Sequence, residues 1–224
     1  MTRSTSTTDV LKRLRAAGSA ANIAGMARYG IRPAKAYGVA TPVIRAIAKD
    51  HRHNPQLAPA LWSTGVLEAR CVAALIADPQ QLPESEVERW VRDFDCWSVC
   101  DSVCIALLWR TPFAWRKVRE WSRREPEYER RAAFALLAAL AVHDKKATDK
   151  QFLSALRLMR KAASDDRNFV KKAVNWALRQ IGKRNAALRE AAIEVAETLI
   201  ATESRSARWI GHDALRELRR KDVS

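Results

Sequence analysis

Hydrophobic residues recur every three or four positions along most of the chain, and this period is typical of amphipathic helices. The alternating β-branched pattern of a half-buried strand is almost absent. Glycine and proline, which interrupt helices, number only 7 and 8 among 224 residues. The clearest helical segments are 9–25, 43–51, 85–94, 114–124, 149–163 and 186–201. The sequence therefore predicts an all-α fold.

Short alanine-rich segments recur at irregular intervals of roughly 30 to 40 residues. They are EARCVAALIA from Glu68, DSVCIALLWR from Asp101, RRAAFALLAAL from Arg130, VKKAVNWALRQI from Val170 and, by composition, REAAIEVAETLI from Arg189. Small residues on one face let helices pack closely, which favours HEAT-like pairs stacked into a curved solenoid; a globular bundle would also accommodate the pattern. In a solenoid, Arg70, Arg131, Lys172 and Arg208 would line one basic concave face.

The stretches between the helical segments are short, the clearest being 37–42, 78–84 and 164–168. None is long enough to separate independent domains, so residues 9–224 are predicted to form a single domain. Residues 1–8 are Ser/Thr-rich with one Arg and no apolar core, which predicts a disordered lead-in and not a secretory signal. No apolar run approaches the roughly 20 residues that span a bilayer.

The charge of the chain is strongly positive. Forty Lys and Arg stand against 25 Asp and Glu, a formal net charge of +15 at pH 7. Such a surplus repels itself in a compact fold, and it favours a polyanionic partner, nucleic acid above all. The alternative is a solvated basic surface without a dedicated partner.

The segment 93–110 carries the first candidate for chemistry. Trp97 and Asp101 are four residues apart, so on a helix they lie one above the other on the same face. Asp101 stands in a mostly apolar sequence, and a carboxylate there must find a partner, cap a helix or face a cleft. Helix capping or an arginine partner would be the purely structural explanation.

A second candidate is a basic helical face with an aromatic residue at its centre. Lys172, Trp176, Arg179 and Lys183 recur at helical spacing, and Lys171 precedes them. Aromatic and basic side chains on one face are a common arrangement for contacting nucleic acid, although a lone tryptophan is more often part of a core.

The cysteines favour packing over metal binding. Cys96, Cys100 and Cys104 form a stripe at four-residue steps, with Cys71 as a distant fourth. Structural metal sites more often use two C-x-x-C pairs, which the chain lacks, so small buried residues between helices are the expectation. The chain also has no phosphate-binding glycine-rich loop and no Ser–His–Asp arrangement, and we expect neither cofactor nor metal.

Four motifs in sequence order resemble the HEAT-like repeat DNA glycosylases of the AlkD type. They are GMARYGIRPAKAYGVATPVIRAIAK from Gly25, WSVCDS from Trp97, RRAAF from Arg130 and KKAVNWALRQ from Lys171. The resemblance extends from Met26 to the last helical segment. One departure is Ser98, where an acidic residue is common in that family.

The resemblance implies a role for each matching residue. Asp101 would be the catalytic carboxylate, Trp97 and Trp176 would be walls against the deoxyribose, and Arg131 would hold the adjacent phosphate. Tyr29, Lys172 and Arg179 match positions that contact the DNA backbone, and Arg28, Lys171 and Lys183 are predicted to bind DNA beside them.

By this resemblance the chain would hydrolyse the N-glycosidic bond of cationic N3- or N7-alkylated purines in double-stranded DNA, as a monofunctional base-excision repair enzyme. It would act as a cytoplasmic, nucleoid-associated monomer without a membrane, metal or cofactor. A non-catalytic HEAT-repeat protein that binds branched or distorted DNA is the main alternative. A solenoid that binds an acidic protein is a second, and a cysteine metalloprotein is a third.

Overall fold

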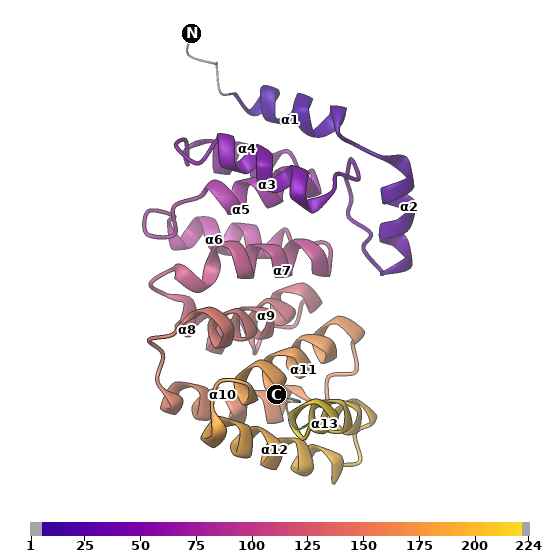
Figure 1. Cartoon of the computed structure of the whole chain (residues 1–224), viewed down its shortest axis with the longest axis vertical. Coiled ribbons are helices and arrows are strands. Elements are labelled where there is room, and N and C mark those ends of the chain that lie inside the picture. The colour runs from indigo at the N-terminus through magenta and orange to yellow at the C-terminus, as the bar shows by residue number, and fades with distance from the viewer. Residues whose placement is uncertain (1–5, 221–224) are drawn as a thin grey trace. The chain divides into compact units, whose positions relative to one another are not determined.

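The computed structural model describes residues 6–220, and its regular elements are all helices (Figure 1). Thirteen α-helices and one 3-10 helix follow one another along this part of the chain. Its only strand-like feature is an isolated bridge between Lys35 and Val66. The predicted all-α fold is confirmed. No helix in this range is long and apolar enough to cross a membrane.

The helices belong to two compact units, Met1–Pro112 and Phe113–Ser224. The first contains α1 (Thr7–Ala16), α2 (Ala20–Arg28), α3 (Thr41–Asp50), α4 (Leu57–Ser63), α5 (Leu67–Ile76), α6 (Glu84–Arg92), α7 (Trp97–Ala106) and the 3-10 helix η1 (Leu108–Arg110). The second contains α8 (Ala114–Trp121), α9 (Glu127–His143), α10 (Asp149–Ala162), α11 (Asn168–Gly182), α12 (Ala186–Ile200) and α13 (Arg205–Leu218). A single domain over 9–224 stays a prediction.

The N-terminal segment differs from its prediction. Of the expected lead-in 1–8, residues 1–5 lie outside the described part, and α1 already begins at Thr7 because Ser6 and Asp9 cap it reciprocally. The expected helix 9–25 is two helices, since the chain turns at Gly18, where a Cβ atom would lie 2.7 Å from the carbonyl oxygen of Tyr37. Ser19 then caps α2 through the backbone N–H of Asn22.

In the first unit, the core forms around α5, which packs against α1, α3, α4 and α7. Two fully buried indoles add to it: Trp62 and Trp90 stack with ring centroids 4.3 Å apart. Helix α2, by contrast, buries none of its residues and stands beside the stacked helices in Figure 1. Its position therefore depends on hydrogen bonds more than on apolar burial.

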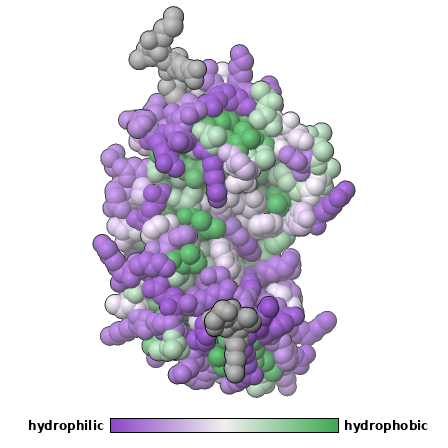
Figure 2. Space-filling view, viewed as in Figure 1, coloured by the Kyte–Doolittle hydropathy of each residue, from purple (hydrophilic) through white to green (hydrophobic). Residues whose placement is uncertain are grey.

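In the second unit, α9 is the central helix. Its residues 131–141 are all buried, five of them between Ala132 and Ala139 being alanine, and it packs against α8 and α11. Helix α13 packs on α11 and α12. The face drawn in Figure 2 is mostly hydrophilic, with smaller hydrophobic areas between. The apolar period of the sequence thus corresponds to buried helix faces.

The first four recurring segments fall on α5, α7, α9 and α11, which alternate along the chain with α4, α6, α8 and α10. The fifth segment, from Arg189, lies in α12. Here the order within the pair is reversed, because α12 packs mainly on α13, the helix that follows it. The recurring segments therefore indicated the repeated unit but not the order within the last pair.

Gly211 marks a close approach between α12 and α13. A Cβ atom there would lie 2.5 Å from the carbonyl oxygen of Ala196 and 2.7 Å from Cγ1 of Ile200. We expect Gly211→Ala to lower the free energy of unfolding by about 1–3 kcal/mol, because overpacking outweighs the helix propensity that alanine adds. Urea denaturation measures the change.

Gly25 provides the matched control, since a Cβ atom at this half-buried position of α2 would meet nothing within 4 Å. Gly25→Ala is expected to be neutral or to stabilise by about 0.5–1 kcal/mol. Equal effects of the two substitutions would contradict close packing at Gly211.

Candidate nucleic-acid interface

Trp97 and Asp101 lie on one face of α7, in the first unit. Cys96 is the N-cap in an extended conformation, Trp97 is the first helical residue, and Asp101 follows one turn later. Both side chains are half-buried, while Cys100 and Val103 beside them are fully buried. The predicted pairing on one helix face is confirmed. Asp101 lies inside the helix and does not cap it, so helix capping as the explanation for this residue is wrong, and an arginine partner stays a prediction.

Tyr29 adjoins Trp97 in the same unit. The indole Nε1–H of Trp97 donates to the backbone carbonyl oxygen of Tyr29 at 3.0 Å. Tyr29 is the C-cap residue of α2 and is 75% exposed, and Arg28 before it is exposed as well. The end of α2 and the start of α7 therefore bring together an aromatic ring, a cation and the Trp97–Asp101 pair.

In the second unit, α11 presents the predicted basic face at the surface. Lys172 and Lys183 are exposed, and Trp176 and Arg179 are half-buried. The opposite face is packed inside the unit through residues such as Ala173, Ala177 and Leu178, which are fully buried. Trp176 is thus not part of the closed core, which was the alternative for a lone helical tryptophan. Cations and an indole share one accessible face.

Glu217 of α13 neutralises part of this face. Its carboxylate forms ion pairs with both Arg179 and Lys183. Burial raises the pKa of Glu217, but the hydrogen bonds from Lys183 and Arg179 outweigh burial, so the pKa is lowered overall. Glu217 stays charged at neutral pH and competes with an anionic ligand for these two cations.

We expect Glu217→Gln to tighten binding of duplex DNA by about threefold at low salt, because it frees Arg179 and Lys183 for phosphate contacts. Fluorescence anisotropy with a labelled duplex measures the effect, and the difference should shrink between about 50 and 200 mM salt. Glu197→Gln is the control, since Glu197 pairs with Arg219 outside the α11 face. Equal gains from the two variants would indicate only a change in net charge.

Two arginines that were expected to line the concave face have partners inside their units. Arg70 has a side chain only 11% exposed; it pairs with Asp93 and Asp95 and lies over the Trp62 ring at 5.0 Å. The expectation that Arg70 is a free cation on the concave face is wrong, because its guanidinium forms ion pairs with neighbouring acidic groups. Arg131 is 5% exposed and donates to the carbonyl oxygen of Phe169. Its phosphate role stays a prediction.

The cysteine stripe is buried in the first unit. Cys96, Cys100 and Cys104 are fully buried on α7 and at its N-cap. Burial raises the pKa of Cys96 to about 11 and that of Cys71 to about 12. Metal ligation and nucleophilic attack both need the thiolate, so at neutral pH Cys71 and Cys96 pack as neutral thiols.

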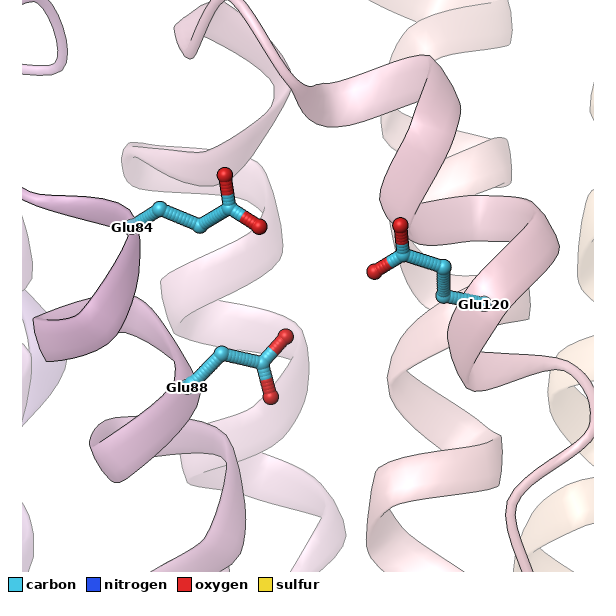
Figure 3. A group of neighbouring side chains, drawn as sticks. All are labelled: Glu84, Glu88 and Glu120. Carbon is cyan, nitrogen blue, oxygen red and sulfur yellow. The ribbon is translucent and has the colours of Figure 1, made fainter.

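Figure 3 draws three glutamates. Glu84 and Glu88 leave α6 one turn apart, and Glu120 belongs to α8. Within the second unit, Glu120 accepts hydrogen bonds from Lys117 at 2.6 Å and Arg116 at 2.8 Å, and the bond from Lys117 lowers the pKa of Glu120 despite burial. Helices α6 and α8 belong to different units, and we assign no metal site to these residues.

No motif in the sequence pointed to the role of Glu68. This glutamate is 1% exposed on α5, and its Oε1 accepts the backbone N–H groups of Gly38 at 2.7 Å and Val39 at 3.1 Å. Tyr37 N–H donates to the same carboxylate at 3.0 Å. Only its place between Leu67 and Ala69, in an apolar segment, signalled that this charge would need internal partners.

The predicted site residues fall into two sets. The first unit holds Arg28, Tyr29, Trp97 and Asp101, and the second holds Arg131, Lys171, Lys172, Trp176, Arg179 and Lys183. The first set meets at α2 and α7, and the second lies on α9 and α11.

Comparison with known proteins supplies independent information. A family model described as DNA alkylation repair enzyme matches residues 10–218. A solved structure described as "a new family of proteins related to the HEAT-like repeat DNA glycosylases with affinity for branched DNA structures" is similar, with a TM-score of 0.79 and 22% identity over 96% of each chain. That likeness establishes a HEAT-like fold. No curated protein matches the chain.

Proposed function

Because the chain belongs to the DNA alkylation repair enzyme family, we propose that it is a DNA glycosylase that removes N3- and N7-alkylated purines from duplex DNA. The observation that carries the proposal is the Trp97–Asp101 pair on one face of α7, beside the exposed Tyr29. An aspartate four residues after a tryptophan also occurs at the corresponding motif of the AlkD-type glycosylases that this chain resembles. The family match supports DNA repair, and this pair supplies the group that the chemistry requires.

The substrate determines what the protein must provide. A purine alkylated at N3 or N7 carries a positive charge and is already a good leaving group, so protonation of the base by a general acid is unnecessary. The deoxyribose, however, becomes oxocarbenium-like as the glycosidic bond lengthens. The demand on the protein is therefore stabilisation of positive charge at the sugar.

Asp101 meets that demand. A carboxylate close to C1′ interacts more strongly with the growing charge of the transition state than with the neutral sugar of the ground state, which is the condition for rate acceleration. The same carboxylate can orient the attacking water or accept its proton. The indole face of Trp97, one turn away, adds cation–π attraction of about 0.5–2 kcal/mol. Catalysis in this proposal is electrostatic, and needs neither metal nor cofactor.

In this proposal the second unit binds phosphates and so positions the protein along the DNA. Lys172, Arg179 and Lys183 provide cations for phosphates, and Trp176 provides an aromatic surface among them. Phosphate contacts determine which nucleotide meets the carboxylate, although they do not read sequence. In the proposed complex, Arg131 is assigned to the phosphate next to the lesion.

A non-catalytic DNA-binding protein is the second candidate. The description of the similar structure, a family with affinity for branched DNA, favours it. Such a protein would share the fold and the basic α11 face, so DNA binding alone cannot separate the two functions. The presence of Asp101 together with Trp97 and Trp176 is what leads us to prefer the enzyme.

Release of 7-methylguanine from methylated duplex DNA tests the choice. Under single-turnover conditions, we expect the protein to release the base well above the spontaneous rate. Tight, salt-sensitive DNA binding with release only at the spontaneous rate would favour the non-catalytic function. If the protein neither releases the base nor binds DNA, both candidate functions are wrong.

A further inference from the structure

Helix α13 has an exposed face that is both aromatic and cationic. Its members recur at three- and four-residue steps, so they lie along one side of the helix, and all are exposed. They are Arg205, Arg208, Trp209, His212 and Arg216. The other side, with Ala207, Ile210 and Ala214, is buried in the second unit. We call the exposed side the α13 aromatic face.

Trp209 is the central residue of this face. It is 39% exposed, whereas Trp62, Trp90 and Trp121 are fully buried. An exposed indole forgoes the favourable burial that a large aromatic side chain usually contributes. The Nζ of Lys171, from α11, lies 5.2 Å from the ring centroid. The indole is therefore adjacent to α11, the predicted DNA-binding helix.

The charge around Trp209 is positive. Arg205 and Arg208 are exposed, and neither forms an ion pair with another residue in 6–220. Asp213, the acidic residue one turn beyond Trp209, pairs with Arg216 at 2.6 Å and accepts the side-chain amide of Asn175 at 2.6 Å. Its charge is thus already compensated, and the two arginines remain available to an anion.

We propose that the α13 aromatic face binds unpaired nucleotides of a DNA strand that continues from the duplex. An unpaired base offers a π-face that stacks on an indole whatever its identity, and its flanking phosphates match two free arginines. A base-paired duplex offers the phosphates but hides its base faces inside the stack. The free Arg205 and Arg208 likewise favour a polyanion over an apolar protein segment.

This inference rests on the proposed function only in taking DNA as the ligand; it does not depend on glycosylase activity. The α13 aromatic face is then a further binding site, through which the protein would engage DNA at gaps, forks or single-stranded tails. The site would act through stacking and charge without base-specific hydrogen bonds, so no sequence preference is expected.

Fluorescence anisotropy with two labelled probes tests the inference: a blunt duplex, and the same duplex with a ten-thymidine 3′ or 5′ tail. We expect the chain to bind one tailed probe more tightly than the blunt one. Trp209→Ala should weaken tailed-probe binding by about 5- to 150-fold, the range for loss of one base–aromatic stack, and leave blunt-duplex affinity within about twofold. The double variant Arg205→Gln/Arg208→Gln should also lose about two phosphate contacts to the tailed probe. The slope of log affinity against log salt concentration should therefore fall by about two.

Matched controls come from α10 and α8 of the same unit. Leu153→Ala removes another exposed hydrophobic side chain, 45% exposed, and Arg119→Gln/Arg157→Gln removes two other exposed arginines. Neither should change the preference for the tail. Absence of that preference in the unmodified chain, or equal losses on both probes with Trp209→Ala, would overturn the inference. Blunt-duplex binding and 7-methylguanine release, measured on the same preparations, report separately on the proposed function.

Discussion

Replacing Asp101 by asparagine is expected to slow the release of 7-methylguanine by about 100-fold or more under single-turnover conditions. Asparagine keeps the size of the side chain and one acceptor oxygen but has no negative charge to stabilise an oxocarbenium-like sugar. The effect should appear in the chemical step and not in binding. Duplex affinity should stay the same or rise slightly, because a negative charge is removed from a DNA-binding surface.

Asp166→Asn is the matched control, since Asp166 is an exposed aspartate in the loop before α11. It should release the base at the unmodified rate. Circular dichroism and urea denaturation of both variants exclude loss of folding as the cause. If Asp101→Asn kept activity within tenfold of the unmodified chain, Asp101 would not be the catalytic carboxylate.

Glu68→Ala is expected to lower the free energy of unfolding by about 3–5 kcal/mol, a large part of the stability of an ordinary domain. The substitution removes the acceptor of three backbone N–H groups, those of Tyr37, Gly38 and Val39. A buried donor without a partner costs roughly 1–3 kcal/mol. Urea denaturation measures the loss, and faster amide hydrogen exchange at 37–39 would locate it.

Glu68 also affects the candidate site through the loop that it anchors. Tyr37 accepts the backbone N–H of Ser19 at 2.8 Å, and the carbonyl oxygen of Gly38 accepts the side-chain amide of Asn22 at 2.8 Å. Both contacts hold α2, which buries none of its residues. Loss of the Glu68 carboxylate should therefore loosen α2 and with it Tyr29, weakening DNA binding.

Glu68→Gln keeps one acceptor oxygen and should cost less than Glu68→Ala. The surface control is Glu190→Ala on α12, where Glu190 is exposed. If Glu68→Ala and Glu190→Ala differed by less than about 0.5 kcal/mol, the loop would not depend on this carboxylate.

Much of the fold could be predicted because it follows from local pattern. Apolar residues at helical period determined the helices, and α3, α6, α8, α10 and α12 begin within two residues of their expected starts. The four-residue spacing of Trp97 and Asp101 was sufficient to place them on one helix face, and the spacing of Lys172, Trp176 and Lys183 did the same for α11. Such positions depend only on the 3.6-residue turn.

Only the tertiary structure decided the partners of the charged side chains. Arg70 and Lys172 look equivalent in sequence, yet Arg70 satisfies Asp93 and Asp95 inside its unit while Lys172 stays exposed. Glu217 pairs with Arg179 of α11 and with Lys183, its C-cap residue, both of which lie 34 or more positions before it in the sequence. Glu68 binds a loop about 30 residues before it. Helical period determines which way a side chain faces, but the group that it meets comes from a distant segment, and only packing brings the two together.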